Sequence, residues 1–260
     1  MIDIDLITEI ITRAGHIALE HFRKVTPTWK ENLTYVTEAD LAVQAYLHRA
    51  LNNVFPGDGV IAEENDLRKP PSAGHRTWIV DPIDGTASFS TGLPVWGVSI
   101  GLVDAGEPVA GYFYAPAVDD LIVTSPEGQV LRNGHPAELR QPRALHRESS
   151  LFIASRLHRH YKVSPAYPGK LRNLGSSAAH LGYVATGSAD CALVERVYAW
   201  DIAAGMAMLN LNGGELRYID GSPVSLPDLI NGEQMRLPML GGHPETIAAF
   251  QKLLTYQPRD

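Results

Sequence analysis

Hydrophobic residues in the first 54 positions recur at steps of three and four. This spacing predicts a helix over residues 3–23 that buries one apolar stripe. A second helix is predicted to begin at Thr37, because "TEADLAVQAYLHRAL" places an N-cap residue first, an acid (Asp40) three positions later, and then a helical pattern. The chain therefore opens with two amphipathic helices.

Short apolar runs follow, and they have the length and punctuation of strands. "GVIAEEN" (59–65) and "TWIVDPIDGT" (77–86) both end in acids, as expected for strands that deliver side chains to one edge of a sheet. Residues 95–116 read as two strands joined through "DAGEP", and residues 119–136 read as a further hairpin. The first half is thus predicted to combine helices with antiparallel strands.

Residues 132–149 are polar and lack periodicity, which makes them the predicted junction between two halves, 1–145 and 146–260. Strand and helix patterns then alternate, which favours a layered α/β arrangement. The predicted strands are 151–155, 191–195 and 215–224, and the predicted helices are 176–187, 200–214 and a terminal helix, 243–256.

Composition narrows the possible functions. The 260 residues are 45% hydrophobic, enough for a sizeable core. The net charge is −7 and Lys and Arg form no run, so we expect neither a nucleic-acid partner nor a membrane surface. Cys191 is the only cysteine and no apolar stretch reaches the ~18 residues of a membrane span, so we expect a cytoplasmic protein without disulfides.

Six carboxylates stand at the ends of predicted elements. Each has an ordinary explanation alone, such as a capping box at Asp40 or a turn at Asp84–Gly85. Brought together, they would repel one another and raise each other's pKa unless a cation held them. Oxygen ligands without cysteine or paired histidine suit Mg²⁺ or Mn²⁺. The six are Asp40, Glu63, Glu64, Asp81, Asp84 and Asp201.

The stretch "DPIDGT" predicts an anion site beside these acids. Pro82 stiffens the turn so that Asp81 and Asp84 can converge, while Gly85 lets backbone approach a ligand and Thr86 offers a hydroxyl. Backbone N–H groups at such a turn bind phosphate. Metal ions beside an anion cradle predict a phosphate-ester site.

Four stretches, in this order and spacing, resemble the inositol monophosphatase family: "VTEAD" (36–40), "IAEEN" (61–65), "WIVDPIDGT" (78–86) and "WDIAAG" (200–205). The resemblance implies a mixed α/β fold, the layered αβαβα sandwich of the inositol monophosphatase/fructose-1,6-bisphosphatase type. It also implies a homodimeric, lithium-sensitive hydrolase with two or three Mg²⁺ per site, Mn²⁺ being the alternative.

The resemblance also assigns roles to individual residues. Asp40, Thr86 and Glu63 correspond to the catalytic group, in which Asp40 and Thr86 orient and deprotonate the attacking water. Gly85 and Thr86 would bind the phosphate, Gly175 and Ser176 the substrate, and Glu64 would support Glu63. Lys30 matches a family lysine only loosely and is left without a role. The implied metal ligands are Glu63, Asp81, the Ile83 carbonyl, Asp84 and Asp201.

The predicted function is hydrolysis of an inositol monophosphate, or a similar small polyol or sugar phosphate, by metal-activated water without a covalent phosphoenzyme. Histidinol phosphate, fructose 1,6-bisphosphate and 3'-phosphoadenosine 5'-phosphate are alternative substrates. A non-catalytic regulatory protein that binds metal and phosphate is the alternative from another class.

One departure from the family pattern bears on specificity. Inositol-specific members carry an acid six residues before the tryptophan of "WD", and this chain has Val194 there, with the acid displaced to Glu195. In an extended segment, this shift turns the side chain to the opposite face unless a bulge intervenes. We therefore expect Val194 to face the substrate, Glu195 to face away, and discrimination for inositol to be weak.

Overall fold

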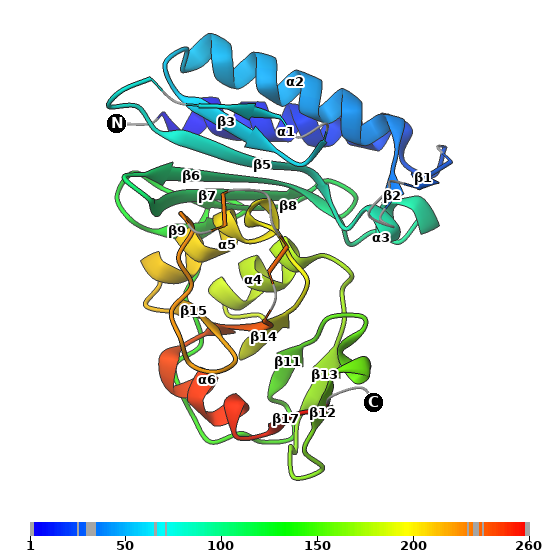
Figure 1. Ribbon diagram of the computed structural model, residues 1–260, viewed down its shortest axis with the longest axis vertical. Helices are drawn as coiled ribbons and strands as arrows, with labels where there is room; N and C mark the ends of the chain where they lie inside the picture. Colours follow the sequence, from blue (N-terminus) through cyan, green and yellow to red (C-terminus); the bar gives the residue numbers. More distant parts are fainter. Residues whose placement is uncertain are drawn as a thin grey trace.

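Five layers of secondary structure follow one another along the long axis of the molecule (Figure 1). The computed structural model describes residues 3–24, 26–29, 35–64, 67–70, 72–227, 229–230, 234–235 and 237–257. The layers are a helix pair, an eight-stranded sheet, a second helix pair, a five-stranded sheet and a last helix. The predicted αβαβα sandwich is confirmed.

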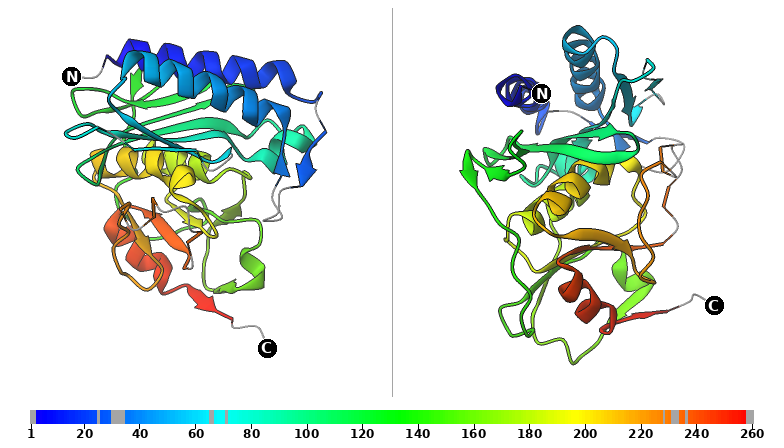
Figure 2. Two further views of the ribbon diagram at one scale, coloured as in Figure 1. Left: turned by 45° about the horizontal axis from the view of Figure 1, so that its top comes forward. Right: turned by 90° about the vertical axis from the view of Figure 1, so that its left-hand side faces the viewer.

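The first layer is formed by α1 (Ile4–His21) and α2 (Glu38–Val54), which lie side by side over one face of the large sheet (Figure 2). Both begin as the sequence predicts: Asp3 caps α1, and Thr37 with Asp40 forms a capping box on α2. Their apolar stripes, Ile7 among them, pack with that face of the sheet into one core. Amphipathic periodicity thus explains this layer fully.

The second layer is the large sheet, with strand order β10-β9-β8-β7-β6-β5-β3-β4. Neighbouring strands are antiparallel except β3 and β5, which run parallel. The strands are β3 (Gly59–Ala62), β4 (Arg68–Lys69), β5 (Thr77–Asp84), β6 (Gly97–Asp104), β7 (Glu107–Ala115), β8 (Asp120–Thr124), β9 (Val130–Arg132) and β10 (His135–Pro136).

The middle layer holds α4 (Ser177–Ala185) and α5 (Ala199–Leu211) between the two sheets. α5 is almost entirely buried, because it packs against β6 and β7 on one side and against α4 and β15 on the other. A side chain at Gly111 of β7 would place its Cβ 2.2 Å from the Ala204 carbonyl oxygen, so the small residues of "DIAAG" let helix and sheet approach closely. This contact fixes the start of α5 beside the end of β5.

The fourth layer is a mixed sheet with strand order β13-β11-β14-β16-β15, covered on its outer face by α6 (Pro244–Gln251). β11 is parallel to both β13 and β14, whereas β16 is antiparallel to both β14 and β15. The strands are β11 (Ser150–Phe152), β13 (Lys170–Arg172), β14 (Cys191–Val194), β15 (Glu215–Tyr218) and β16 (Met239–Gly242).

Several short elements were not predicted from the sequence. Besides β4, β13 and β16, they are the pair β1 (Thr28–Trp29) and β2 (Tyr35–Val36), the helix α3 (Thr86–Thr91), the 3₁₀ turn η2 (Leu157–Arg159), and the pair β12 (Tyr161–Val163) and β17 (Leu254–Tyr256). The predicted helix 243–256 is wrong at its end, because the chain leaves the helix after Gln251 and pairs as β17 with β12.

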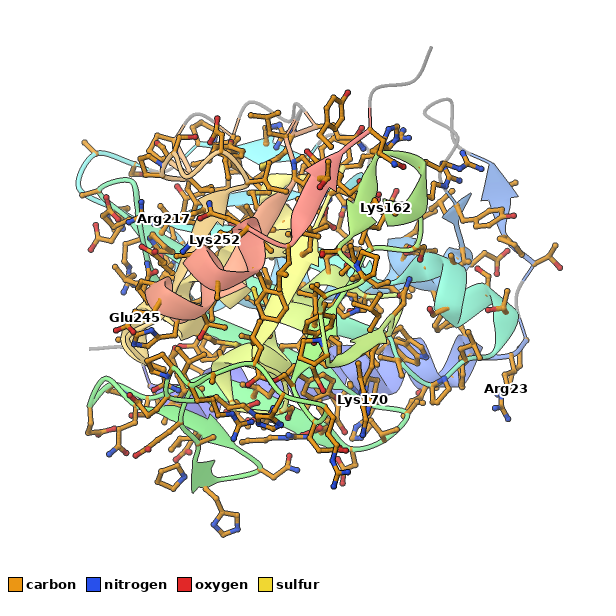
Figure 3. The ribbon with its side chains drawn as sticks, turned by 90° about the horizontal axis from the view of Figure 1, so that it is seen from below. Arg23, Lys162, Lys170, Arg217, Glu245 and Lys252 are labelled. Carbon is orange, nitrogen blue, oxygen red and sulfur yellow. The ribbon has the colours of Figure 1, made fainter. Side chains whose placement is uncertain are left out.

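Residues 137–149 run without helix or strand from the large sheet to β11, within the predicted junction. The division into halves at residue 145 stays a prediction. Seen from below, the labelled Lys162, Lys170 and Arg23 lie on separate parts of this face, whereas Arg217 and Lys252 fall close together in the view (Figure 3). No helix among the described residues combines the length and apolar character needed to cross a membrane.

Candidate active site

Asp81 and Asp84 converge because strand β5 contains a bulge. Residues three apart in a regular strand point to opposite faces of the sheet. Here Asp81 pairs with Ser99 and Asp84 with Gly97, so one extra residue lies between the two pairings and both acids reach the same side. Pro82, which has no N–H to offer a neighbouring strand, suits the bulge. The Ile83 N–H donates to Asp81 Oδ1 at 2.9 Å and fixes that carboxylate.

Glu63 reaches the same place from the neighbouring strand. β3 is parallel to β5 with Ala62 opposite Val80, so Glu63 follows β3 at the level of Asp81. Glu64 is buried next to it, and the Gln44 side chain holds its backbone with two hydrogen bonds, from Nε2 to the carbonyl (2.7 Å) and from the N–H to Oε1 (2.8 Å). This clamp fixes the end of β3.

Asp201 comes from the first turn of α5. Its Oδ2 accepts the Tyr198 N–H at 2.6 Å, which closes the start of the helix. The Tyr198 and Trp200 rings stack with centroids 4.8 Å apart, and the Arg68 guanidinium lies 5.5 Å from the Trp200 ring. The aromatic stack holds the helix start and therefore the carboxylate.

The carboxylate oxygens of Asp81, Asp84 and Asp201 lie within 4.8 Å of one another. The pKa of each carboxyl group is raised, and the largest cause is burial, which removes water from the charged form. Repulsion by the neighbouring carboxylates, Glu63 included, raises the pKa of Asp81 and Asp201 further. The pKa of Asp84 rises to about 6. We call Glu63, Asp81, Asp84 and Asp201 the acidic cluster. The mutual repulsion of these carboxylates and their oxygen donor atoms suit the binding of a hard divalent cation.

Asp84 is held from across the molecule by the start of α4. Its Oδ2 accepts the Ser176 hydroxyl and the Ala178 N–H, the latter at 2.7 Å. Ser176 is also the N-cap of α4, accepting the Ala179 N–H at 3.0 Å. A Cβ on Gly85, whose φ is +93°, would lie 3.0 Å from the Gly175 carbonyl oxygen, so the two turns touch. Gly175 and Ser176 therefore hold Asp84 and the turn at Gly85 from behind, and neither is part of the pocket lining; their predicted contact with the substrate stays a prediction.

Asp40 and Thr86 also meet, as predicted. Asp40 is fully buried, and its Oδ2 accepts both the N–H (2.8 Å) and the hydroxyl (2.6 Å) of Thr37. Its Oδ1 lies 3.4 Å from the Thr86 hydroxyl, which is also 3.1 Å from the Ile83 carbonyl oxygen. The capping box thus has a second consequence, because it orients Asp40 so that Oδ1 faces the Thr86 hydroxyl.

A pocket of about 420 Å³ opens over these groups. Its lining includes seven predicted site residues: Glu63, Asp81, Ile83, Asp84, Gly85, Thr86 and Asp201. Asp40, Glu64, Gly175 and Ser176 contact or adjoin that lining from behind. Lys30 lies outside the described residues.

Two arginines also line the pocket and were not predicted from the sequence. They are Arg156 and Arg196, which we call the arginine pair. A signal was present, since each follows a strand of the second sheet by a few residues.

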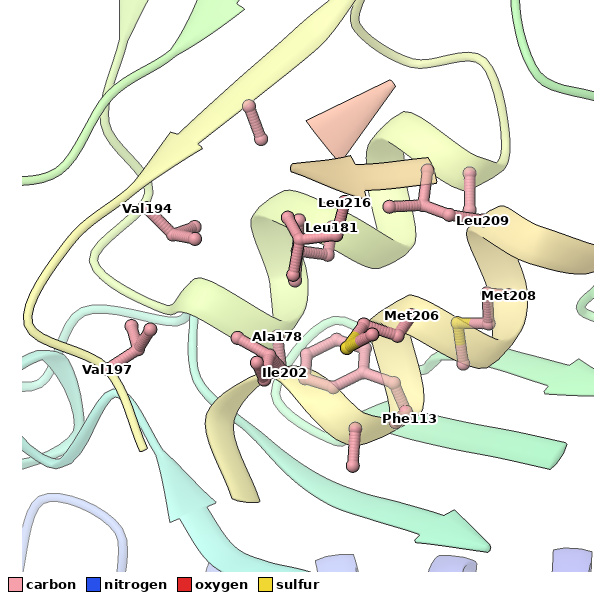
Figure 4. Close-up of a cluster of buried hydrophobic side chains, with 14 of the residues drawn as sticks. Phe113, Ala178, Leu181, Val194, Val197, Ile202, Met206, Met208, Leu209 and Leu216 are labelled. Atoms are coloured by element: carbon pink, nitrogen blue, oxygen red, sulfur yellow. The ribbon is translucent and has the colours of Figure 1, made fainter. Parts of the chain in front are cut away.

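The expectation for Val194 and Glu195 is wrong. Val194 is 1% exposed and points into the apolar cluster with Val197 and Ala178 (Figure 4), whereas Glu195 lines the pocket. The two side chains do point in opposite directions, but the faces are the reverse of those expected: Val194 shares the inner face of β14 with Ala192, and Glu195 follows the last residue of the strand, just before Arg196 with its left-handed φ of +56°. An acid is therefore present at the pocket.

Trp78, Trp96 and Trp200 are all buried. Cys191 is fully buried in β14, where burial raises the pKa of its thiol, so it packs as a small apolar residue.

Comparison with known proteins agrees with this geometry. The inositol monophosphatase family model matches residues 4–248. A Mesorhizobium japonicum protein named inositol-1-monophosphatase is 34% identical over 197 residues, covering 72% of this chain and 73% of the relative. A Chlorobaculum parvum protein named histidinol-phosphatase is 31% identical, covering 82% and 84%. The crystal structure of extragenic suppressor protein suhB from Bartonella henselae superposes with a TM-score of 0.80 at 22% identity, covering 96% of each chain. The chain belongs to the inositol monophosphatase family, and it is a phosphatase, a hydrolase of phosphate monoesters.

Proposed function

We propose that this protein is a Mg²⁺-dependent phosphomonoesterase that acts on a small polyol or sugar phosphate. The observation that carries the proposal is the convergence of three carboxylates within 4.8 Å, those of the buried Asp81 and Asp84 and the half-buried Asp201, in a pocket that Gly85 and Thr86 also line. Buried like charges at this spacing are costly unless a cation neutralises them.

The predicted site residues would each have a part in the reaction. Glu63, Asp81, Asp84, Asp201 and the Ile83 carbonyl would hold Mg²⁺, in a site that takes two or three ions. Bound Mg²⁺ polarises the phosphoryl oxygens and lowers the pKa of a coordinated water. The backbone N–H groups of Gly85 and Thr86 would orient the phosphate, and Glu63 acts both as a ligand and as part of the catalytic group.

Asp40 and Thr86 would handle the proton of the attacking water. Thr37 occupies one oxygen of Asp40, so the other remains directed at the Thr86 hydroxyl. The Thr86 hydroxyl donates a hydrogen bond to Asp40 or to the Ile83 carbonyl, so its oxygen can accept a hydrogen bond from the water. As the water attacks, its proton would pass to the Thr86 oxygen and the Thr86 proton to the Asp40 carboxylate. The attacking oxygen is thereby oriented toward phosphorus, without a covalent phosphoenzyme.

The substrate remains open among inositol 1-phosphate, histidinol phosphate, fructose 1,6-bisphosphate and 3'-phosphoadenosine 5'-phosphate. The two relatives above carry different substrate names at 34% and 31% identity, which supports a small phosphorylated metabolite without selecting one. The rival from another class, a protein that binds metal and phosphate without turnover, is opposed by the intact contact between Asp40 and Thr86.

Phosphate release tests the proposal. We expect hydrolysis of at least one substrate in a panel of inositol 1-phosphate, histidinol phosphate and glycerol 2-phosphate. Activity should require Mg²⁺, cease with excess chelator and return when Mg²⁺ is restored. Binding of Mg²⁺ and inorganic phosphate without any hydrolysis would instead support the regulatory protein.

We also propose lithium sensitivity, because a small monovalent cation can occupy a more weakly held cation position and slow product release. Millimolar LiCl is expected to inhibit more strongly than the same concentration of NaCl. Equal inhibition by the two salts would reduce the effect to ionic strength and contradict this part of the proposal.

A cytoplasmic homodimer is the assembly that the family resemblance implies for this enzyme. Light scattering coupled to size-exclusion chromatography should give twice the chain mass of 28.4 kDa. A single-chain mass at micromolar concentration would contradict it.

A further inference from the structure

The arginine pair has no part in the chemistry proposed above. Arg156 and Arg196 both line the pocket, and both are exposed. Among the described residues, no acid makes an ion pair with either guanidinium, whereas Arg76, Arg132 and Arg140 each pair with an aspartate. Two permanent positive charges are therefore available to a ligand.

The topology of the second sheet brings the two arginines together. β11 and β14 are parallel neighbours, with Leu151 opposite Cys191 and Phe152 opposite Ala192. Arg156 follows the end of β11 and Arg196 the end of β14, so both leave the same edge of the sheet. This edge is where α/β sheets place their ligand sites.

The backbone at Arg196 adds a second observation. Its φ of +56° lies in the left-handed region, which a residue with a Cβ adopts less readily than glycine. The chain places a long cationic side chain at this position of the pocket wall although glycine fits the backbone better. Such local strain is concentrated at ligand-binding positions.

Guanidinium groups only donate hydrogen bonds, and they match carboxylate and phosphate oxygens geometrically. Glu195 contributes one negative charge to the same lining, so with the arginine pair this part of the pocket keeps a net charge of one positive unit. A neutral polyol would leave that charge uncompensated. A pocket of about 420 Å³ holds a small molecule with two anionic ends.

We propose that the preferred substrate carries a second anionic group, a carboxylate or a second phosphate, on the alcohol that leaves. The scissile phosphate lies at the acidic cluster and the second anion contacts Arg156 and Arg196. This inference rests on the proposed phosphatase function and specifies its substrate class.

Matched substrate pairs test it. Glycerol 2-phosphate and 2-phosphoglycerate differ by one hydroxymethyl group replaced with a carboxylate, and fructose 1-phosphate and fructose 1,6-bisphosphate differ by one phosphate. With free Mg²⁺ held constant, kcat/KM should be higher by about tenfold or more for the anionic member of at least one pair. The pair with the larger ratio identifies the second anion as carboxylate or phosphate.

Two variants assign the effect to the arginine pair. Arg196→Gly removes the guanidinium at a backbone position that favours glycine, and Arg156→Gln removes the other charge; each should lower the ratio within the preferred pair severalfold. Arg159→Gln, at an exposed position outside the pocket lining, is the charge-matched control and should keep the ratio.

Ratios near one in both pairs, or ratios that neither variant lowers, would overturn the inference while Mg²⁺-dependent hydrolysis leaves the proposed function standing. Hydrolysis of inositol 1-phosphate or histidinol phosphate without hydrolysis of any of the four compounds would also overturn the inference alone, whereas absence of hydrolysis for all six compounds in the presence of Mg²⁺ would overturn both.

Discussion

The acidic cluster and the arginine pair line one pocket, but they are built in opposite ways. Asp81 and Asp84 are buried, and Asp81, Asp84 and Asp201 each accept a hydrogen bond from a backbone N–H, of Ile83, Ala178 and Tyr198 respectively. Arg156 and Arg196 are exposed and make no ion pair with a described acid. A rigid, preorganised set of ligands suits a bound metal ion, which occupies the same position with every substrate. Exposed arginine side chains suit the part of the substrate that differs from one compound to another.

The largest effect is expected within the acidic cluster. Asp84→Asn keeps the shape of the side chain and can still accept the Ala178 N–H, but it removes a charge from the proposed metal site. Replacing even a residue that only supports a metal ligand typically lowers metal affinity or activity by about 10- to 100-fold. Activity should therefore fall below about one hundredth of the wild-type value.

Asp104→Asn, at an exposed position at the end of β6, is the control for this change and should leave turnover intact. Circular dichroism should show both variants folded. A folded Asp84→Asn enzyme with normal turnover would remove the acidic cluster from the mechanism.

The next comparison separates Val194 from Glu195. Val194→Glu would bury an unpaired charge in the apolar cluster between the sheets, so it should lower the free energy of unfolding by about 4 kcal/mol or prevent folding. Val194→Ala should lose about 2 kcal/mol, and Glu195→Gln less than about 1 kcal/mol. Urea unfolding measures all three. A stable Val194→Glu protein with better turnover of inositol 1-phosphate would restore the original expectation that Val194 faces the substrate.

A smaller effect is expected at His180, which supports the turn against Gly85. Its Nε2 accepts the Leu174 N–H at 2.9 Å and its ring stacks on Phe152, and burial lowers its pKa to about 4. Between pH 6.5 and 4 the unfolded chain therefore binds a proton that the folded chain does not. The contribution of neutral His180 to the free energy of unfolding is therefore fully present above pH 6.5. It is lost as the pH decreases toward 4, by up to about 3 kcal/mol.

His180→Gln has no such titration, so its unfolding free energy should decline less steeply over that pH range than that of the wild type. Parallel declines in the two proteins would show that His180 does not carry this pH dependence.

Local signals predicted much of the fold and of the acidic cluster, because caps, periodicity and strand-ending acids act over a few residues. The strand β16 was missed since "MLGG" offers four residues, two of them glycines, and its pairing with β14 is long-range. Val194 was misplaced because alternation predicts that Val194 and Glu195 point to opposite sides but not which side faces the pocket, which depends on how β14 packs against α4. The arginine pair stayed unseen because Arg156 and Arg196 meet only through the pairing of β11 with β14.

Metal titration tests the central claim, that the acidic cluster is a cation site, most directly. Calorimetry with Mn²⁺ or Mg²⁺ should show binding to the wild type and to Asp104→Asn with the same affinity. Asp201→Asn, which can keep the hydrogen bond from the Tyr198 N–H, should bind at least about tenfold more weakly. Equal affinity in all three proteins would place the metal elsewhere and contradict the account.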